Sequence, residues 1–492
     1  MHRTVCLLLF VFLSVNAVAQ RLVMPGDNAD PSVVKIGDTF WASSTTSNWM
    51  PAYPLISSTD LHNWKTVGHA FNTLPAWADY YFWAPEISYD NGKVYIYYSA
   101  HKKGGNLCVA IASADKPEGP YKDHGPIICE QAGSIDAFPM RDENGKLFII
   151  WKEDGNSIGK PTPIWIQELN EERTAVTGTK KELFRNEAGW EGNLVEGVSM
   201  MRHNNYIYAF YAGAGCCGLT CNYQSGVARS KSLLGPWEKF AGNPVLVNQG
   251  EWNCPGHGTP VEKDGRFYFL YHAYDSNGSV YSGRQGLLKE FVFTADNWIK
   301  FLDEPTLAKP DVPRKADEFN GRTLNNDWQW SVFQNMPAII KSGRLTINVF
   351  NEFIPALVGQ KTFTPNYRAL TKVHRRKSTA AAGLSLVGDD KNLLCAWFKG
   401  NNIEIIQTKD GKDSTLVVRP IGTDKAGYMA MQVLDGKDIL FLYGKDRNAL
   451  KPLHQQPFNG AYLPPWDRAL RVGLAAKGKV GEKAMFESFE ME

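Results

Sequence analysis

The feature that most constrains the fold of this chain is a pattern that recurs five times within the first three hundred residues. Each copy has a short motif, then a tight turn, then a strand rich in aromatic and β-branched residues. The motifs are Ala29-Asp30-Pro31, Trp83-Ala84-Pro85-Glu86, Ile135-Asp136-Ala137-Phe138, Val195-Glu196-Gly197-Val198 and Gly256-His257-Gly258-Thr259. The turns are Gly37-Asp38, Asn91-Gly92, Asn144-Gly145, Asn204-Asn205 and Asp264-Gly265. The period of roughly 53–60 residues is typical of propeller-type repeats.

Each repeat contains enough strand-like sequence for a four-stranded antiparallel sheet. Asn-Gly and Asp-Gly turns supply the positive φ that a tight hairpin needs, so each turn joins two antiparallel strands. Later strand-like segments follow, for example 107–112. Five such sheets set radially leave only short, protected edges, and aromatic rings fill the wedges between them. We therefore expect an all-β fold that begins with a five-bladed β-propeller over residues 20–303. The alternative is a two-sheet sandwich whose strands are similar by accident.

A propeller brings the starts of its five inner strands together around one axis. Aligned on the turns, these positions hold Asp30, Ala84, Asp136, Glu196 and His257. Like charges in a semi-buried space raise one another's pKa, so three carboxylates placed there indicate chemistry. Two other acids, Asp27 and Glu191, lie close to these positions in the sequence, but they stand at a different distance from the turn than the five aligned residues.

Four of these motifs, Ala-Asp-Pro-Ser, Trp-Ala-Pro-Glu, Ser-Ile-Asp-Ala-Phe and Val-Glu-Gly, resemble glycoside hydrolase family 43 in their order and spacing, over about residues 22–300. The resemblance implies a five-bladed propeller that cleaves glycosidic bonds with inversion. It assigns Asp30 as the general base that holds water and Glu196 as the general acid. Asp136 would orient Glu196 and raise its pKa. Inversion predicts a separation of about 6.5–9.5 Å between the carboxyl groups of Asp30 and Glu196.

The resemblance also implies substrate and metal contacts. Arg284 would face the substrate or the catalytic acid, and His257 would bind a central, mostly hydrated calcium ion directly or through water. Calcium prefers oxygen ligands, so a purely hydrogen-bonding histidine is the alternative. Trp83 and Phe138 adjoin the axial positions and are predicted to contact sugar rings, with packing inside the sheets as the alternative. The chemistry itself requires no cofactor.

A proline-rich linker, residues 304–315, precedes a change of pattern. Residues 316–492 read as short alternating strands without helical periodicity, for example 343–349 and 402–407, which predicts a β-sandwich. This half is similar to the concanavalin-A-like jelly-roll domain appended to many family 43 xylosidases and arabinofuranosidases, where it buttresses the propeller and contributes to the pocket rim.

The N-terminus predicts secretion. Residues 1–19 have a basic start, a short apolar run and Ala17-Val18-Ala19, which is typical of a cleaved signal peptide. We expect a secreted or periplasmic protein that is not anchored in a membrane. The net charge of +2, without a block of basic residues, argues against a nucleic-acid partner. Oligomeric state stays open.

Seven cysteines remain after Cys6 leaves with the signal peptide, so at least one has no intramolecular partner. They are Cys108, Cys129, Cys216, Cys217, Cys221, Cys254 and Cys395. A secreted protein favours disulfides over a zinc site built from the cysteines around 216–221, Cys254 and a histidine, but the pairing cannot be read from the sequence.

Together these features predict an inverting, exo-acting O-glycoside hydrolase that releases xylose or arabinose from plant cell-wall oligosaccharides such as xylan or arabinoxylan fragments. A family 43 enzyme that acts on arabinan or β-1,3-galactan is an alternative, as is a propeller that binds carbohydrate without cleaving it. The segment Thr45-Thr46-Ser47-Asn48-Trp49 departs from the Phe-Glu-Trp arrangement of the xylosidases compared with it, which leaves arabinofuranosidase activity fully open.

Overall fold

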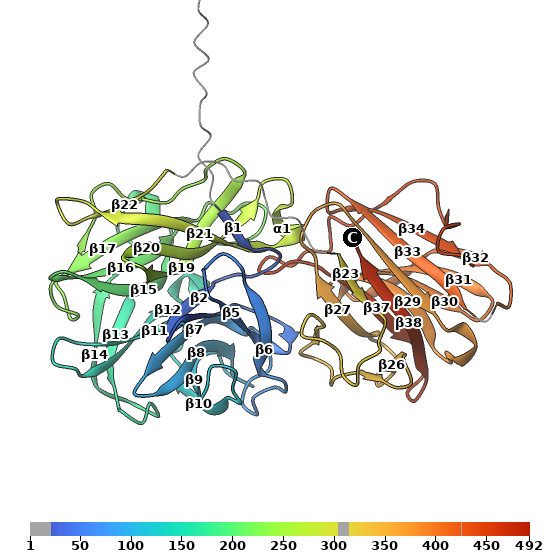
Figure 1. Ribbon diagram of the computed structural model, residues 1–492, viewed down its shortest axis with the longest axis horizontal. Helices are drawn as coiled ribbons and strands as arrows, with labels where there is room; N and C mark the ends of the chain where they lie inside the picture. Colours follow the sequence, from blue (N-terminus) through green and yellow to red (C-terminus); the bar gives the residue numbers. More distant parts are fainter. Residues whose placement is uncertain (1–20, 304–313, 425) are drawn as a thin grey trace, which may run out of the picture.

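The computed structural model describes residues 21–303, 314–424 and 426–492; the expected signal peptide and most of the expected linker lie outside these ranges. Strands are the dominant regular structure of the described chain, which forms two parts that lie side by side (Figure 1); this confirms the all-β class. Its helical segments are short: α1 (Ser279–Ser282) and three 3-10 turns, η1 (Gly155–Ile158), η2 (Gly189–Glu191) and η3 (Arg375–Lys377). None of the helices described is long and apolar enough to cross a membrane.

The first part contains five antiparallel sheets, one for each sequence repeat. The first sheet contains β2 (Ser32–Ile36), β3 (Thr39–Ser43), β5 (Ala52–Ser58) and β6 (Lys65–Phe71), and the second contains β7 (Trp83–Asp90), β8 (Lys93–His101), β9 (Leu107–Ala114) and β10 (Lys122–Ile128). The third sheet contains β11 (Ser134–Arg141), β12 (Leu147–Glu153), β13 (Ile164–Leu169) and β14 (Val176–Phe184). The fourth contains β15 (Val195–His203), β16 (Tyr206–Gly213), β17 (Gln224–Ser230) and β18 (Glu238–Lys239). The fifth combines β19 (Trp252–Lys263), β20 (Arg266–Asp275), β21 (Arg284–Phe293) and β22 (Ile299–Phe301) with β1 (Arg21–Met24) from the start of the chain.

The first strands of neighbouring sheets contact one another. Contacts join β2 to β7, β7 to β11, β11 to β15, β15 to β19 and β19 to β2. Aromatic side chains fill the space between sheets, as the composition predicts. Phe210 of the fourth sheet and Phe269 of the fifth, for example, are buried with ring centroids 5.0 Å apart. Such wide apolar contacts are a main source of stability for the first part.

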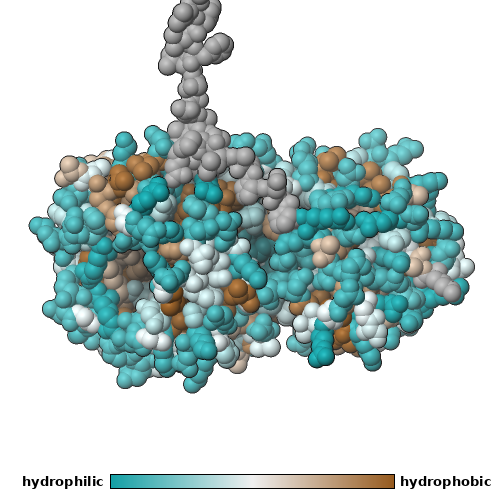
Figure 2. Space-filling model, viewed as in Figure 1, coloured by the Kyte–Doolittle hydropathy of each residue, from teal (hydrophilic) through white to brown (hydrophobic). Residues whose placement is uncertain are grey.

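The second part consists of two antiparallel sheets that enclose one apolar core. One sheet contains β25 (Ala338–Ile340), β26 (Leu345–Asn348), β38 (Lys483–Met491), β28 (Tyr367–Val373), β33 (Gly427–Leu434), β34 (Asp438–Gly444), β35 (Lys451–Pro452), β23 (Lys315–Asp317) and β36 (Phe458–Asn459). The other contains β27 (Ala356–Lys361), β37 (Arg471–Lys477), β29 (Ala381–Asp389), β30 (Asn392–Lys399), β31 (Asn402–Lys409) and β32 (Lys412–Pro420). Hydrophilic side chains cover most of the face seen in Figure 2, as expected when apolar residues are used in cores.

The two parts are joined by backbone pairing and by packing. A short strand of the first part, β4 (Trp49–Met50), pairs with β24 (Trp330–Ser331) of the second. The Trp49 side chain is buried among Leu357, Trp397 and other apolar residues of the second part. This arrangement fixes the second part against the end of the first that carries the sequence motifs.

Three disulfides are formed among the described residues: Cys108–Cys129, Cys216–Cys217 and Cys221–Cys254. Cys395 is free and buried. All seven cysteines that follow the expected signal peptide are thereby accounted for. The cysteines considered for a zinc site are instead bonded to one another, in agreement with the preference for disulfides.

Candidate active site

Four of the five sequence motifs form β-bulges at the beginnings of the first strands. The ladder register shifts between Trp83 and Glu86, between Ile135 and Phe138, and between Gly256 and Gly258. The residues at these irregularities, and Asp30 just before β2, have positive φ: 51° at Asp30, 41° at Ala84, 58° at Asp136 and 40° at His257. This conformation is uncommon for residues other than glycine and costs about 1–3 kcal/mol each. Bulges re-aim side chains, and strain of this kind is concentrated at functional sites.

In the fourth sheet the positive φ, 62°, belongs to Gly197, and Glu196 is the residue before it. The alignment on turns, which made Glu196 equivalent to Asp136, is therefore wrong by one residue. The cause is packing: a Cβ atom on Gly197 would lie 2.7 Å from Cγ of His257. Only glycine fits beside the histidine, so the acid occupies the adjacent position.

Asp30, Asp136 and Glu196 line one cavity of about 420 Å³. His257, Trp83 and Arg284 also line it, together with Lys152 and two residues of the second part, Trp466 and Asp467. The structure thus brings six of the seven predicted site residues to one place, although they are spread over more than two hundred and fifty positions of the sequence.

Asp30 is held as an ionised carboxylate. Its Oδ1 accepts a hydrogen bond from Nη1 of Arg284 at 2.9 Å, and its Oδ2 accepts one from the Thr45 hydroxyl at 2.7 Å. Nδ1 of His257 lies 3.5 Å from Oδ1. Burial acts to raise the pKa of Asp30, but Arg284, His257 and His272 outweigh it and hold this pKa well below its usual range. Asp30 can therefore accept a proton.

Glu196 is bound by two donors. Nζ of Lys152 lies 2.6 Å from its Oε2, and the Tyr223 hydroxyl donates to its Oε1 at 2.8 Å. Burial acts to raise the pKa of Glu196, but Lys152 and then Tyr223 lower it below its ordinary value. In the free protein Glu196 is thus the ionised member of its pair with Asp136.

Asp136 carries the opposite shift. Its Oδ2 accepts the backbone N–H of Gly197 at 2.9 Å and lies 3.9 Å from Nδ1 of His257. Burial raises the pKa of Asp136 to about 6, with the negative charges of Glu196 and Asp30 adding to the effect against His257 and Lys152. The sequence argument expected the raised pKa on Glu196; Lys152, which that argument did not include, moves it to Asp136.

The second part of the chain completes the cavity. The indole Nε1 of Trp83 donates to Oδ2 of Asp467 at 3.2 Å and to the Ser47 hydroxyl oxygen at 3.1 Å, and Ser47 in turn donates to Asp467. Nη2 of Arg284 donates to the Asp467 carbonyl at 2.9 Å. One residue of the second part therefore fixes two predicted substrate contacts.

The aromatic residues at the cavity differ in their surroundings. Trp83 is half-buried, stacks on Tyr81 with a centroid distance of 4.3 Å, and meets the edge of Trp466 at 5.7 Å. Phe138 is 9% exposed and packs in the apolar core between the third and fourth sheets. Its predicted contact with substrate is not supported by this position, because a ring in that core fills the wedge between sheets.

The rival acids have structural partners. Oδ2 of Asp27 accepts from Nη1 of Arg471 and from the Ala469 backbone N–H, both at 3.2 Å, and so ties the two parts together. Glu191 is fully buried, is paired with Lys239 at 2.7 Å and accepts the Tyr211 hydroxyl. Neither belongs to the residues that line the cavity.

The residues around His257 do not form a set of calcium ligands. Its Nδ1 faces the carboxylates of Asp30 and Asp136. Within the part of the chain that the structure describes, no group of three or more His, Cys, Asp or Glu side chains is arranged to hold a metal ion. Because calcium takes six to eight oxygen ligands, these residues do not fit a protein-built calcium site. The calcium prediction is untested, and no step of the chemistry needs it.

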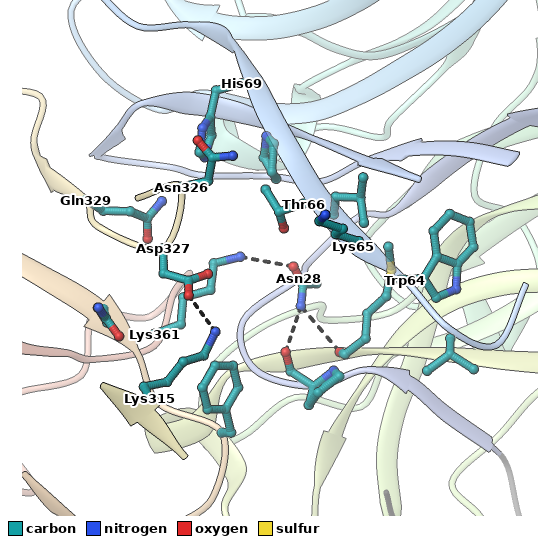
Figure 3. A pocket seen from close by; sticks show the side chains of 17 residues that line it. Asn28, Trp64, Lys65, Thr66, His69, Lys315, Asn326, Asp327, Gln329 and Lys361 are labelled. Carbon is teal, nitrogen blue, oxygen red and sulfur yellow. Dashed lines mark hydrogen bonds and ion pairs between the residues drawn. The ribbon is translucent and has the colours of Figure 1, made fainter. Parts of the chain in front are cut away.

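A second cavity, of about 400 Å³, lies where the two parts meet (Figure 3). Lys361 points from β27 to Asn28, whose Oδ1 accepts its hydrogen bond at 3.0 Å. Among the described residues lining this cavity, Asp327 is the one carboxylate, and it is paired with Lys315 at 2.6 Å. A cavity without two carboxylates cannot support the two-carboxylate chemistry of glycoside hydrolysis.

Sequence reasoning missed five residues that hold the site: Thr45, Lys152, Tyr223, His272 and Asp467. Lys152 had a signal, because it is a basic residue that directly follows the apolar run Leu147–Trp151 of a predicted buried strand. Tyr223 and Asp467 lie in sequence with no local pattern, and their partners are 27 and 384 residues away. Only the fold reveals such pairs.

The chain is similar to known carbohydrate-active proteins over both parts. The family model for glycosyl hydrolases family 43 matches residues 19–299, and the model for the beta xylosidase C-terminal concanavalin A-like domain matches residues 316–492. A non-reducing end alpha-L-arabinofuranosidase of Bacteroides ovatus is 26% identical over 82% of each chain. A beta-xylosidase of Bacillus subtilis is 28% identical over 62% of this chain and 63% of its own.

The fold is likewise similar to a solved structure. The crystal structure of a xylan beta-1,4-xylosidase from Bacillus halodurans has a TM-score of 0.80 at 20% identity and covers 96% of this chain and 99% of its own. With a matching family model over more than half of the sequence and three carboxylates in one cavity, the chain belongs to glycosyl hydrolases family 43 and is a glycoside hydrolase.

Proposed function

We propose that this protein is an inverting, exo-acting glycoside hydrolase that releases xylose or arabinose from oligosaccharides of plant cell walls. The observation that carries the proposal is the meeting of Asp30, Asp136 and Glu196 at one cavity. The named activities of the Bacteroides and Bacillus relatives support a pentose as the sugar released.

The proposed framework is a closed five-bladed propeller, residues 20–303, followed by an accessory β-sandwich, residues 316–492. Pairing of β1 with β21 supports closure, because the N-terminal strand completes the last sheet. The contact between β19 and β2 supports it as well. In this framework the carboxylates lie at one end of the axis. The predicted signal peptide adds the proposal that the mature protein is secreted or periplasmic.

The roles of the carboxylates follow from their partners. Asp30, kept ionised by Arg284, removes a proton from water as the water oxygen attacks the anomeric carbon. The bond from that carbon to the departing oxygen breaks, and Glu196 supplies the proton that this oxygen takes up. In the free protein the proton of the acidic pair resides mainly on Asp136, since Lys152 favours ionised Glu196. The developing negative charge on the departing oxygen draws the proton to Glu196.

Exo action is supported by how the cavity is bounded. Trp466 and Asp467 of the second part line it together with residues of the first. A cavity bounded in this way suits the terminal sugar of a chain more than the middle of a long polymer. The candidate substrates for the tests below are xylosides, arabinofuranosides, arabinan and β-1,3-galactan. The Thr45–Trp49 segment does not decide between them.

Hydrolysis of nitrophenyl β-xyloside and α-L-arabinofuranoside tests the proposal. We expect Asp30→Asn and Glu196→Gln each to lower kcat at least about a thousandfold without loss of fold, while Glu191→Gln, outside the cavity, retains catalysis in the fraction that folds. NMR of the first-formed sugar should show inversion; a retained anomeric configuration contradicts the assigned roles.

The second candidate function is carbohydrate binding without catalysis. The presence of all three carboxylates weighs against it. Wild-type protein that binds the sugars but cleaves none of a panel of nitrophenyl glycosides would favour this alternative.

A further inference from the structure

The loop between β16 and β17 carries a disulfide between adjacent residues. Cys216 and Cys217 are bonded to each other, and both line the cavity that contains the three carboxylates. Consecutive side chains ordinarily point apart; a bond between two adjacent cysteines closes a small ring with the peptide unit and turns both sulfur atoms to one side. The ring thus presents two sulfur atoms and two methylene groups as a single apolar surface.

This surface belongs to the same wall as other apolar groups. Cys216 packs against a buried cluster that includes Leu194, Tyr223 and Tyr274, and Leu194 lines the cavity as well. The loop also approaches the second part of the chain, because a Cβ atom on Gly218 would lie 3.7 Å from the carbonyl oxygen of Trp466. The disulfide therefore lies on the side of the cavity where the two parts meet.

The loop is fixed independently of this disulfide. The Gly215 N–H donates to Oδ1 of Asn222 at 2.7 Å, and the Asn222 N–H donates to the Gly215 carbonyl at 3.0 Å. A second disulfide, Cys221–Cys254, ties the end of the loop to β19. Tyr223, which donates to Glu196, lies two residues after Cys221. A bond between Cys216 and Cys217 is thus not needed to hold Tyr223 or to close the loop.

We propose that the Cys216–Cys217 disulfide is a specificity-determining contact that packs against the C–H face of a pentose ring in the cavity. The inference rests on the proposed glycoside hydrolase function and names a further binding group for its substrate. Sulfur is polarisable and apolar in character, and it makes favourable dispersion contacts. Two separate thiols or hydroxyls would turn freely and bring polar hydrogens into the same space.

The first test asks whether the bond exists. Thiol titration of the unfolded protein from Gln20 onward should find one free thiol, that of Cys395. Free thiols found by peptide mapping at Cys216 and Cys217 would overturn the proposal.

The second test separates sugar contact from positioning of the acid. In Cys216→Ser/Cys217→Ser we expect KM for the preferred nitrophenyl pentoside to rise about tenfold, which corresponds to about 1.4 kcal/mol, with kcat within about twofold of wild type. In the control Cys221→Ser/Cys254→Ser we expect kcat to fall and the pH profile to shift, because Tyr223 loses its support. Unchanged KM in the first variant, or a fall in kcat and a pH shift like those of the control, would overturn the proposal.

The third test does not depend on turnover. Calorimetry with free xylose and arabinose, carried out in the Glu196→Gln background, should show weaker binding of the preferred sugar once Cys216 and Cys217 are replaced by serine or by alanine. Equal affinity in all three proteins would overturn the contact. Absence of hydrolysis by the wild type, combined with this loss of affinity, would refute the proposed catalysis and leave the contact standing.

Discussion

The ammonium group of Lys152 lies 2.6 Å from Oε2 of Glu196, inside the cavity that also holds Asp30 and Asp136. Lys152 is 1% exposed, so water does little to screen this pair. The assigned general acid therefore rests in its ionised form beside a cation, and the energy needed to protonate it is set by that cation.

Replacing Lys152 by methionine should shift the pH dependence of the enzyme. Without the ammonium group, the pKa values of Glu196 and Asp136 both rise, so the acidic pair keeps its proton to higher pH. We expect the alkaline limb of kcat/KM, which lies near pH 6 if it reports the pair, to move upward by about one unit. The measurement is a pH profile of kcat/KM. Lys152→Arg keeps the charge and should shift the limb much less; identical limbs in all three proteins would contradict the assignment.

Replacing Asp136 by asparagine should stabilise the protein while lowering its activity. The pKa of Asp136 is raised from 3.8 to about 6, so the folded protein binds this proton more tightly than the unfolded chain does. Stability from this group is therefore complete below pH 4 and is lost as pH rises to about 6, a loss of about 3 kcal/mol. The amide side chain in Asp136→Asn cannot ionise, so the variant should unfold at higher temperature than wild type at pH 7 and at nearly the same temperature at pH 4. A variant that is less stable at pH 7 would contradict this.

Asp27 and Asp30 are three residues apart but should respond differently to replacement by asparagine. Asp27 accepts hydrogen bonds from Arg471 and Ala469 of the second part, so its loss should weaken the interface, lower Tm and raise KM by loosening Trp466 and Asp467. Asp30→Asn should abolish turnover at saturating substrate, and it should also lower Tm, because the buried Arg284 guanidinium loses its carboxylate partner. Thermal unfolding and steady-state kinetics on both variants check this. A loss of kcat in Asp27→Asn equal to that in Asp30→Asn would reverse the roles of the two aspartates.

Trp466 should contribute to substrate affinity more than to stability. Its ring is 55% exposed and meets the edge of Trp83 at the cavity. We expect Trp466→Ala to raise KM about tenfold with a small change in Tm, and Trp466→Phe to recover most of the affinity. Phe333, which is 56% exposed and does not line this cavity, offers a matched control, since Phe333→Ala should leave KM unchanged.

The arrangement of strands and the approximate positions of the carboxylates could be predicted from the local sequence. The turns at Asn91-Gly92 and Asp264-Gly265 have the positive φ angles expected of tight hairpins, and each repeat folds into its own sheet. Counting from the turns put Glu196 one residue out of register, because turn position says nothing of the bulge in which Gly197 makes room for His257. Domain boundaries and catalytic roles stay predictions.

The partners that set the electrostatics of the site could not be predicted in the same way. Lys152 reaches Glu196 across 44 residues, and Asp467 reaches Trp83 across 384. The position of Lys152 after an apolar run marks the residue as unusual, but no periodicity or motif identifies the partner in either pair, since pairing depends on how whole sheets pack. Phe138 shows that proximity in sequence can also mislead. It lies two residues after Asp136, which suggested a role at the cavity, but the alternation of side chains along β11 directs its ring into the core.

Because Arg284 and Trp83 both donate hydrogen bonds to Asp467, the pocket can be completed only after residue 467 has been synthesised. A ribosome reaches residue 301 with every assigned carboxylate already synthesised, but the group that receives both of these bonds is still some one hundred and sixty codons away. The nascent chain can assemble its sheets during that interval, yet it cannot finish the pocket. We therefore expect a fragment that ends before residue 467 to lack the acceptor of both hydrogen bonds, and to have little activity.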